Sequence, residues 1–285
     1  MNNRPLLSVV IPTYNEEEDI EECLKTLYNQ DYKKIEVIIV DDGSKDKTLR
    51  IVHRFKKVKL IKQNHKGPGA ARNLGAKFAK GEILIFVDSD MSFPKNFLAK
   101  LTKPIIEGKA IGTTRETEIV KNTENIWSRC WGRVRVRRKE SERAGAFRAI
   151  RTDKFFELGG FDSRYGYADD QTIFFKYGIR PTVAGGARCY HKNPETLKGV
   201  YNQSKWIGAS IDNNLLLKIP MINLFALFIM VLFFPLSIIY LSLRKCYKNK
   251  DWEIFVPWMF IFITARYFGT IHGIINKIYF NKNAR

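Results

Sequence analysis

Residues 83–94 read ILIFVDSDMSFP, and here two carboxylates follow directly on a run of apolar residues. The five apolar side chains of Ile83 to Val87 predict a strand that is buried on both faces. Asp88 and Asp90 come next, separated only by Ser89. Carboxylates this close repel each other unless a cation, hydrogen-bond donors or bulk water relieve them. The stretch therefore predicts either a ligand site at the end of a strand or a solvated turn, because Asp and Ser are also common turn residues.

Three earlier apolar runs predict further strands of the same sheet. They are LLSVVIP (6–12), IEVIIVDD (35–42) and VKLIK (58–62). Between the strands, apolar residues recur with helical spacing in Glu16–Tyr28, Asp46–Phe55 and Pro68–Ala79. Four strands linked by three helices indicate an α/β domain with a parallel sheet.

Polar residues collect where these strands end. PTYNEEE (12–18) follows the first strand, DDGS (41–44) the second and DSD (88–90) the fourth. In an open parallel sheet, ligands bind outside the carboxyl ends of the strands. Paired carboxylates suit Mg²⁺ or Mn²⁺, which typically join one or two carboxylates to substrate phosphates. This edge of the sheet is therefore predicted to bind a phosphorylated ligand together with a divalent cation.

The composition limits the kinds of partner. The chain has 285 residues, of which 45% are hydrophobic, enough for one large domain and an appendage. Its formal net charge of +19 indicates an anionic partner, which is nucleic acid, anionic lipid or a phosphorylated substrate. Four scattered cysteines without a CxxC pair favour a reducing compartment. The apolar run near the N-terminus is too short for a signal peptide, so we expect the first domain to stay in the cytoplasm.

The last quarter of the chain predicts a membrane region. Met221–Leu243 carries no charge and is long enough to cross a bilayer. Ile254–Ile275 is a weaker candidate because it contains Arg266 and His272, and it is either a second span or an interfacial helix. We therefore expect a globular domain over residues 1–215 and a membrane region over residues 216–285, with helices at 221–243 and 254–275.

Five motifs in order make the chain resemble the family 2 glycosyltransferases, which have the GT-A fold, over about residues 6 to 206. The motifs are SVVIPTYNE (8–16), VDDGS (40–44), GPGAARNLGAKFAKGE (67–82), FVDSD (86–90) and LGGFDSRYGYADDQTIFFK (158–176). The resemblance implies a GT-A nucleotide-diphospho-sugar transferase fold for the α/β domain, which becomes the catalytic domain. It also implies a nucleotide-sugar donor.

The resemblance assigns roles to residues at the strand ends. Substrate-binding residues would be Pro12, Tyr14, Glu16, Asp42, Arg72, Asp88 and Asp169. Within this set, Asp42 would accept a hydrogen bond from the base, Arg72 would lie near the diphosphate and Asp88 would hold ribose. Asp90 would bind the divalent cation, Mg²⁺ or Mn²⁺, and His191 falls where related enzymes often have a histidine near the metal.

The acceptor side is represented by GYADDQT, where Asp169 replaces the family's usual Glu and Asp170 aligns with the catalytic Asp. An inverting transfer needs a base to take the proton of an acceptor hydroxyl, and Asp170 is the candidate. A phosphate acceptor is already ionised and needs little help from a base. The chain has NQSKW (202–206) where processive members carry QxxRW, so repeated polymer extension does not follow from the resemblance.

Between Trp127 and Arg143, seven basic residues lie among tryptophans and valines, as in a solvated basic segment or a surface that contacts lipid phosphate. Together these features predict a multi-pass enzyme of the cell membrane with its catalytic domain on the cytoplasmic side. It would transfer a sugar with inversion to a membrane lipid, either polyprenyl phosphate or a lipid-linked saccharide.

Two alternatives come from other classes of protein. One is a haloacid-dehalogenase-like phosphotransferase, but that motif usually continues DxDx[TV], whereas Met91 and Ser92 follow Asp90. The other is a membrane-tethered nucleic-acid-binding protein. It accounts for the positive charge and leaves the acids at the strand ends unexplained, so a nucleic-acid partner is not favoured.

Overall fold

The structure is a computed structural model that describes residues 4–143, 145–210 and 233–280. The chain forms two compact units. Unit 1 comprises Met1–Ile119, Val134–Ser163 and Ala168–Lys192, and unit 2 comprises Val120–Arg133, Arg164–Tyr167 and Asn193–Arg285. The domain boundary predicted between residues 215 and 216 lies outside the described residues and stays a prediction.

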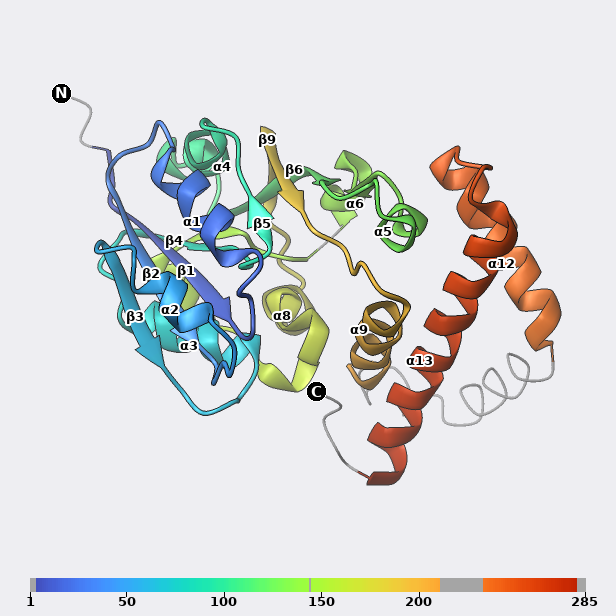
Figure 1. Cartoon of the computed structure of the whole chain (residues 1–285). Coiled ribbons are helices and arrows are strands. Elements are labelled where there is room, and N and C mark those ends of the chain that lie inside the picture. The colour runs from blue at the N-terminus through green and yellow to red at the C-terminus, as the bar shows by residue number, and fades with distance from the viewer. Residues whose placement is uncertain (1–3, 144, 211–232, 281–285) are drawn as a thin grey trace. The chain divides into compact units, whose positions relative to one another are not determined.

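The first half of unit 1 has the predicted alternation of strands and helices (Figure 1). The elements are β1 (Leu7–Thr13), α1 (Ile20–Tyr28), β2 (Ile35–Asp41), α2 (Thr48–Val52), β3 (Val58–Lys62), α3 (Pro68–Lys77) and β4 (Ile83–Phe86). Strand β1 pairs in parallel with both β2 and β4, and β2 pairs in parallel with β3. The prediction of four parallel strands linked by three helices is therefore confirmed.

The second half of unit 1 extends the same sheet with antiparallel strands. Its elements are β5 (Met91–Ser92), α4 (Phe97–Ile106), β6 (Gly112–Val120), β7 (Val134–Val136), α6 (Arg138–Arg143), β8 (Ala149–Arg151), α7 (Thr152–Glu157), η1 (Ser163–Gln171), α8 (Thr172–Tyr177) and β9 (Thr182–His191). The described strands run in the order β3-β2-β1-β4-β8-β6-β9-β5, and β7 pairs with β6. Because β8 is antiparallel to β4, the sheet is mixed, which the sequence did not predict.

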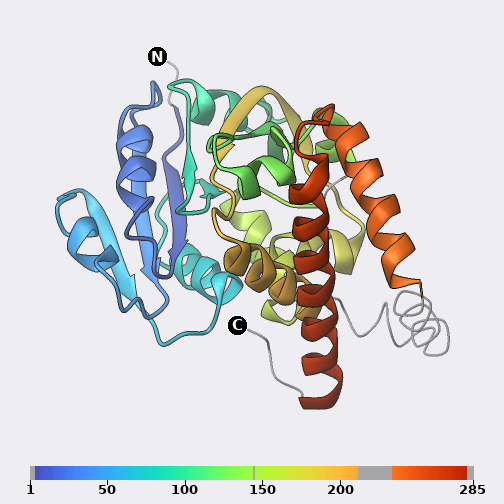
Figure 2. The same cartoon turned by 45° about the vertical axis from the view of Figure 1, so that its right-hand side comes forward.

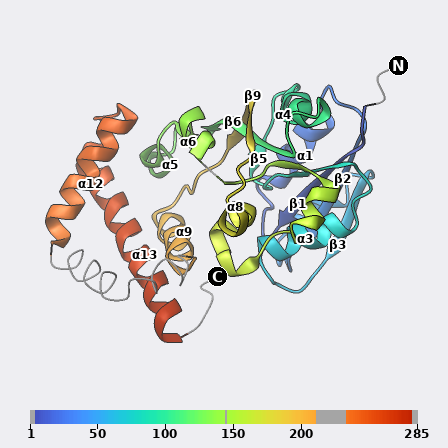
Figure 3. The ribbon, with the colours of Figure 1, turned by 180° about the vertical axis from the view of Figure 1, so that it is seen from behind.

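Two cores lie on opposite faces of this sheet, because side chains alternate along a strand. On β1, Val9 and Ile11 share a cluster with residues of α1 and α4. Val10, which points the other way, joins Phe86 and residues of α3, α7 and α8 (Figures 1 and 3). Strands buried on both faces explain the continuous apolar runs of the sequence.

The packing of α3 depends on one glycine. A Cβ atom at Gly75 would lie 2.4 Å from the Cγ1 atom of Val10 and 3.1 Å from the Cγ2 atom of Val40. Helix α3 therefore lies directly on β1 and β2. Its start is set by Gly67, whose φ of 91° favours glycine, and by Pro68 in the first turn, where a missing N–H has no cost.

We expect Gly75→Ala to lower the thermal unfolding midpoint of the protein, because a methyl group so close to Val10 forces α3 away from the sheet. The cost of such overpacking is typically about 1–3 kcal/mol. Gly185→Ala is the matched control, since a Cβ there meets no atom within 4 Å. Equal midpoints for the two variants would contradict this account of the packing.

Unit 2 contains α5 (Ile126–Trp131), α9 (Leu197–Ala209), α12 (Phe234–Asn249), the irregular turn η2 (Phe255–Met259) and α13 (Phe260–Phe280). Helices α9 and α13 pack closely, because a Cβ at Gly208 would lie 2.2 Å from the Thr270 carbonyl oxygen. Helix α12 lies beside α13 (Figure 2). Cys130 of α5 belongs to the same buried cluster as Cys246 of α12 and Phe262 of α13.

The two predicted spans have different outcomes. Residues 221–232 of the first lie outside the described residues. Of the remainder, Phe233 precedes α12 and the rest belongs to α12, which continues past Leu243 to Asn249. Within the part that the structure describes, one helix, Phe255–Lys277, is long and apolar enough to cross a membrane. It contains most of the second predicted span. Two transmembrane helices are therefore not confirmed.

Candidate active site

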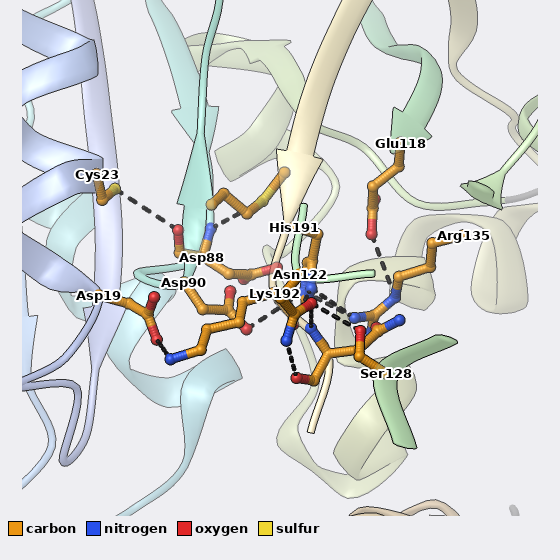
Figure 4. A network of polar contacts seen from close by, with 12 residues as sticks. Asp19, Cys23, Asp88, Asp90, Glu118, Asn122, Ser128, Arg135, His191 and Lys192 are labelled. Carbon is orange, nitrogen blue, oxygen red and sulfur yellow. Dashed lines mark hydrogen bonds and ion pairs between the residues drawn. The ribbon is translucent and has the colours of Figure 1, made fainter. Parts of the chain in front are cut away.

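Asp90 and His191 face each other because the short strand β5 pairs with the end of β9. The chain leaves β4 at Phe86, passes Asp88 and Asp90, and enters β5 at Met91. Strand β5 is antiparallel to β9, with Met91 opposite His191. The Nε2 atom of His191 consequently lies 3.4 Å from the Oδ2 atom of Asp90 (Figure 4). The sheet register thus brings together residues 90 and 191, which are 101 positions apart in the chain.

The imidazole of His191 is held in one orientation. Its Nδ1 atom lies 2.5 Å from the backbone carbonyl oxygen of Lys192, which only a protonated Nδ1 can satisfy. The Nε2 lone pair then faces both Asp90 and the guanidinium of Arg135, whose Nη1 atom lies 2.8 Å away and can donate to it. Burial and the neighbouring Arg135 guanidinium lower the pKa of His191, so the ring is neutral.

The buried Glu118 holds Arg135, which in turn contacts His191. Glu118 of β6 accepts hydrogen bonds from the Nε atom of Arg115 at 3.0 Å, and its other oxygen lies 3.2 Å from the Nε atom of Arg135. The Nη1 atom of Arg135 lies 2.7 and 2.8 Å from the two ring nitrogens of His191 (Figure 4). Burial alone would raise the pKa of Glu118, but Arg115 and Arg135 lower it to about 2, so Glu118 is ionised.

Asp88 is compensated by two guanidinium groups. Its Oδ1 atom lies 2.6 Å from Nη2 of Arg72, and its Oδ2 atom lies 3.1 Å from Nη1 of Arg148. Burial alone would raise the pKa of Asp88, but Arg148 and Arg72 hold it well below its usual range. Arg148 reaches the site because Ala149, the next residue, pairs with Ile85 of β4. Asp88 is therefore a permanent carboxylate.

The same two arginines connect Asp88 to the predicted acceptor side. Nη1 of Arg72 lies 2.5 Å from Oδ1 of Asp169, and Nη2 of Arg148 lies 3.9 Å from Oδ2 of Asp170. Asp169 is buried, and this burial raises its pKa to about 6 although Arg72 opposes the shift. The side chain of Asp170 is 16% exposed, against 2% for Asp169. Of the two, Asp170 is the carboxylate that a substrate can reach.

Negative charge is in excess on the other side of Asp90. Burial and the carboxylates of Asp90, Asp19 and Asp88 raise the pKa of Glu16 to about 9. The pKa of Asp90 is also raised, chiefly by burial, and His191 only partly offsets the effect. Asp19 has its own cation, since its Oδ2 atom lies 3.2 Å from Nζ of Lys192. The raised pKa values favour the protonated forms of Glu16 and Asp90, and a bound cation would favour the ionised forms.

Asp42, which is predicted to contact the nucleoside, is held in place by several hydrogen bonds. The carboxylate of Asp42 accepts hydrogen bonds from the backbone N–H groups of Lys66 and Gly67 at 2.7 and 2.8 Å, and from Nε2 of Gln63 at 2.7 Å. Nδ1 of His65 lies 3.0 Å from its Oδ2 atom. Asp42 therefore fixes the loop before α3, and a base would have to displace one of these donors to bond with it.

Tyr14 and Pro12 are the two other residues predicted to contact the nucleoside. Tyr14 is exposed, and its ring lies 4.2 Å from that of His65, centroid to centroid, which offers an aromatic surface for stacking. Pro12 is buried in β1 opposite Val40 and lies one residue before the strand end. The structure thus brings all ten predicted site residues into unit 1. Their roles stay predictions.

The residues at Asp90 fit a divalent cation. The Oδ1 atom of Asp90 is buried and has no hydrogen-bond partner among the described residues. Asp90, directly before β5, and His191, at the end of β9, supply an oxygen and a nitrogen donor. Within residues 4–143, 145–210 and 233–280, no group of three or more His, Cys, Asp or Glu side chains is close enough to hold a metal. Further ligands would have to come from substrate and water.

Several site residues were not predicted from the sequence. They are His65, Arg115, Glu118, Arg135, Arg148 and Lys192. The available signal was a charge inside an apolar strand, such as Arg148 in AFRAI, because a buried charge requires a partner. The basic stretch from Trp127 to Arg143 is also partly neutralised, since Arg138 pairs with Glu116 and Glu142.

Comparison with known proteins defines the class. Residues 8–163 match the family described as Glycosyl transferase family 2, which is more than half of the chain. The chain therefore belongs to the family 2 glycosyltransferases, and this membership supports a transferase activity that moves a sugar. It does not favour a phosphotransferase or a nucleic-acid-binding protein.

The curated relatives are similar over parts of their length. A poly(ribitol-phosphate) beta-N-acetylglucosaminyltransferase, TarS of Staphylococcus aureus (strain Mu50), is 47% identical over 90 residues, covering 29% of this chain and 16% of that protein. A GalNAc(5)-diNAcBac-PP-undecaprenol beta-1,3-glucosyltransferase of Campylobacter jejuni is 37% identical over 112 residues, covering 37% of this chain and 36% of that protein. The chain thus spans well under half the length of either relative.

Solved structures establish the fold. A mannosyltransferase from Pyrobaculum calidifontis, solved with GDP-Man and Mn²⁺, has a TM-score of 0.60 and 21% identity, covering 99% of this chain and 89% of that one. S. aureus TarS 1–349 in complex with UDP-GlcNAc has a TM-score of 0.52 and 18% identity, covering 96% and 91%. At such identities the likeness shows the fold alone. The α/β unit is therefore a mixed GT-A-like glycosyltransferase fold.

We expect Glu118→Gln to destabilise the protein at neutral pH by about 3 kcal/mol, from a pKa that moves from 4.5 to about 2 on folding. A depressed pKa contributes stability above the unfolded value, and this contribution is lost as the pH falls. The difference in unfolding free energy between the two proteins should hence shrink between about pH 4.5 and pH 2. Urea denaturation over this range measures it.

The matched control is Glu142→Gln, whose side chain is 51% exposed beside Arg138. A surface pair contributes about 0–1 kcal/mol, so this variant should remain close to the parent protein at every pH. If the difference in unfolding free energy between the parent protein and Glu118→Gln did not change with pH, the charge of Glu118 would not be the source of the stabilisation.

Proposed function

We propose that the protein transfers a sugar, with inversion at the anomeric carbon, from a nucleotide-sugar donor to an acceptor carried by a membrane lipid. Polyprenyl phosphate and a lipid-linked saccharide are the two acceptor classes. The proposal depends on the difference between two carboxylates that lie two residues apart. Both oxygens of Asp88 accept hydrogen bonds from arginines, whereas the buried Oδ1 atom of Asp90 has no partner among the described residues. Family membership supports the transfer of a sugar.

Asp90 and His191 would hold Mg²⁺ or Mn²⁺ together with oxygens of the donor diphosphate. The bound cation supplies positive charge that stabilises the leaving nucleoside diphosphate. His191 would offer its Nε2 lone pair in place of the hydrogen bond that Arg135 can donate to it, and Asp90 would offer the buried Oδ1 atom. A mannosyltransferase of the same fold has been solved with Mn²⁺, which agrees with this choice of metal.

The remaining residues would bind and orient the two substrates. Asp88, fixed by Arg72 and Arg148, accepts hydrogen bonds from the ribose hydroxyls. Tyr14 and Asp42 border the base. Asp170 takes the proton of an acceptor hydroxyl as its oxygen attacks the anomeric carbon, and the bond to the diphosphate breaks. The position of Asp170 supports this role, because its side chain is 16% exposed and its Oδ2 atom lies 3.9 Å from Nη2 of Arg148, which also contacts Asp88.

A lipid acceptor is supported by two observations. The C. jejuni relative is named for a substrate linked to undecaprenol through a diphosphate. In the described residues, Phe255–Lys277 also has the length and composition of a membrane span. A membrane enzyme with its catalytic unit on the cytoplasmic side would meet nucleotide sugars where they are made. Incubating membranes that hold the protein with a panel of nucleotide sugars, followed by mass analysis of extracted lipids, tests donor and acceptor together.

We expect Asp90→Asn to lower the transfer rate on the order of 10²-fold or more, because the substitution removes the charge that holds the cation and keeps the shape. Mn²⁺ binding, followed by electron paramagnetic resonance with nucleoside diphosphate present, should weaken in parallel. Asp31→Asn, an exposed aspartate of the same unit, is the control. Full activity of the parent protein in excess chelator would exclude the metal.

We expect Asp170→Asn to lower kcat by about 10²- to 10⁴-fold for a hydroxyl acceptor, since the base is lost and the hydrogen-bonding shape is kept. Donor affinity, measured by calorimetry, should change little. Asp153→Asn, an exposed aspartate beside Arg151, is the matched control. Normal turnover combined with lost donor affinity would assign Asp170 to the nucleotide site instead.

A further inference from the structure

Helix α12 has two faces of different character. Its inner face packs into the core of unit 2 through Ile238, Ser242 and Cys246, which are buried at successive turns. Its outer face carries large apolar side chains that lie 41–77% exposed, at a spacing of three or four residues: Leu236, Ile239, Tyr240, Leu243 and Tyr247. We call these five residues the outer stripe. A helix with a core already on one side does not need a second apolar stripe to fold.

The exposed apolar surface continues beyond α12. Trp252, Val256 and Trp258, in and before the turn η2, are 52%, 64% and 40% exposed. On α13, Ile261 and Phe268 are 39% and 50% exposed. Exposed apolar residues are ordinary when scattered singly, but here they follow one another along a helix and the turn after it. Tryptophan and tyrosine are the residues enriched where membranes meet water.

Positive charge accompanies this surface. Arg244, Lys245 and Lys248 lie in the last turns of α12, and Lys250 follows. The nearby acids are already bound, because Arg129 lies 2.6 Å from Asp251 and 2.6 Å from Glu253. The C-terminal end of α12 therefore presents a net positive charge beside apolar side chains. Anionic lipid headgroups complement that combination, and a second copy of this basic chain does not.

The described residues of α12 are too few for a span. Its 16 residues measure about 24 Å at 1.5 Å per residue, short of a hydrocarbon core of about 30 Å. Arg244, Lys245 and Lys248 in its last turns limit the uncharged part of α12 to Phe234–Leu243. A helix with an apolar stripe, interfacial aromatic residues and basic residues instead lies in the plane of the interface.

We propose that the outer stripe of α12 binds the interfacial layer of an anionic bilayer, with the helix parallel to the membrane plane. Leu236 and Leu243 enter the boundary between headgroups and acyl chains, and Arg244 and Lys250 contact lipid phosphates. This proposal goes beyond the transfer reaction, since bilayer binding requires neither donor nor acceptor. Because α12 lies beside α13, a membrane contact through an in-plane α12 is an alternative to a bilayer span by α13.

Vesicle binding by the full-length protein tests the proposal. The triple variant Leu236→Glu, Tyr240→Glu, Leu243→Glu should bind vesicles of equal phosphatidylglycerol and phosphatidylcholine at least about tenfold more weakly than the parent protein, because three apolar contacts are lost. The control is Ile106→Glu, Tyr177→Glu, which alters equally exposed apolar residues of unit 1. Arg244→Glu, Lys250→Glu should weaken binding to these vesicles and leave binding to pure phosphatidylcholine vesicles unchanged.

Depth measurements separate a helix in the plane from a span. The four native cysteines are buried and free, so spin labels can be placed at Leu236→Cys, Leu243→Cys and Tyr247→Cys. In the plane, all three labels should lie at one depth. Along the bilayer normal, the first and last would differ by about 16 Å.

Three results would overturn the proposal. They are unchanged vesicle binding by the triple glutamate variant, a graded label depth, and a lipid-free dimer that the triple variant dissociates. Vesicle binding without sugar transfer would remove only the proposed function, and transfer without vesicle binding would remove only this inference.

Discussion

The carboxylate of Asp88 lies between the guanidinium groups of Arg72 and Arg148, and the rest of the site depends on this contact. An ionised carboxylate inside a protein requires paired charge, and removing one partner of such a pair is strongly destabilising. Arg72 comes from α3 and Arg148 from the strand pairing of β8 with β4. Each arginine also approaches a second carboxylate, Asp169 or Asp170. These ion pairs therefore connect four segments of the chain.

Asp90 lies two residues further on and has the opposite environment. Its neighbour is a neutral imidazole, one of its oxygens has no partner among the described residues, and the carboxyl groups around it raise the pKa of Glu16 to about 9. Environments that differ this much give two carboxylates different chemistry at one pH. Asp88 is suited to accept hydrogen bonds from a substrate, whereas Asp90 is suited to meet a cation. The register of β5 on β9 creates this difference, because it places His191 rather than an arginine beside Asp90.

In unit 2, the apolar helix α13 contains two polar side chains, Arg266 and His272, that contact other parts of the unit. On α13, the Arg266 guanidinium lies 4.2 Å from the ring centroid of Trp131, and Nδ1 of His272 lies 2.5 Å from the hydroxyl of Tyr201. These contacts direct both polar side chains towards protein, so they do not prevent the helix from being apolar elsewhere. Helix α12 differs, because several of its large apolar side chains are exposed and do not pack into the core of unit 2.

The amino-acid sequence by itself determined the parallel half of the sheet, the helices between its strands and the acids at the strand ends. These features follow from local patterns: a run of apolar residues, helical spacing, or a glycine and proline before a helix. Only the tertiary structure decided which charges meet. Arg72 and Asp169 are 97 positions apart, and Arg148 and Asp88 are 60 apart, so no local pattern relates them. The same reason applies to the C-terminal helices. Composition shows that they are apolar, whereas the neighbours of each face decide which side chains remain for a membrane.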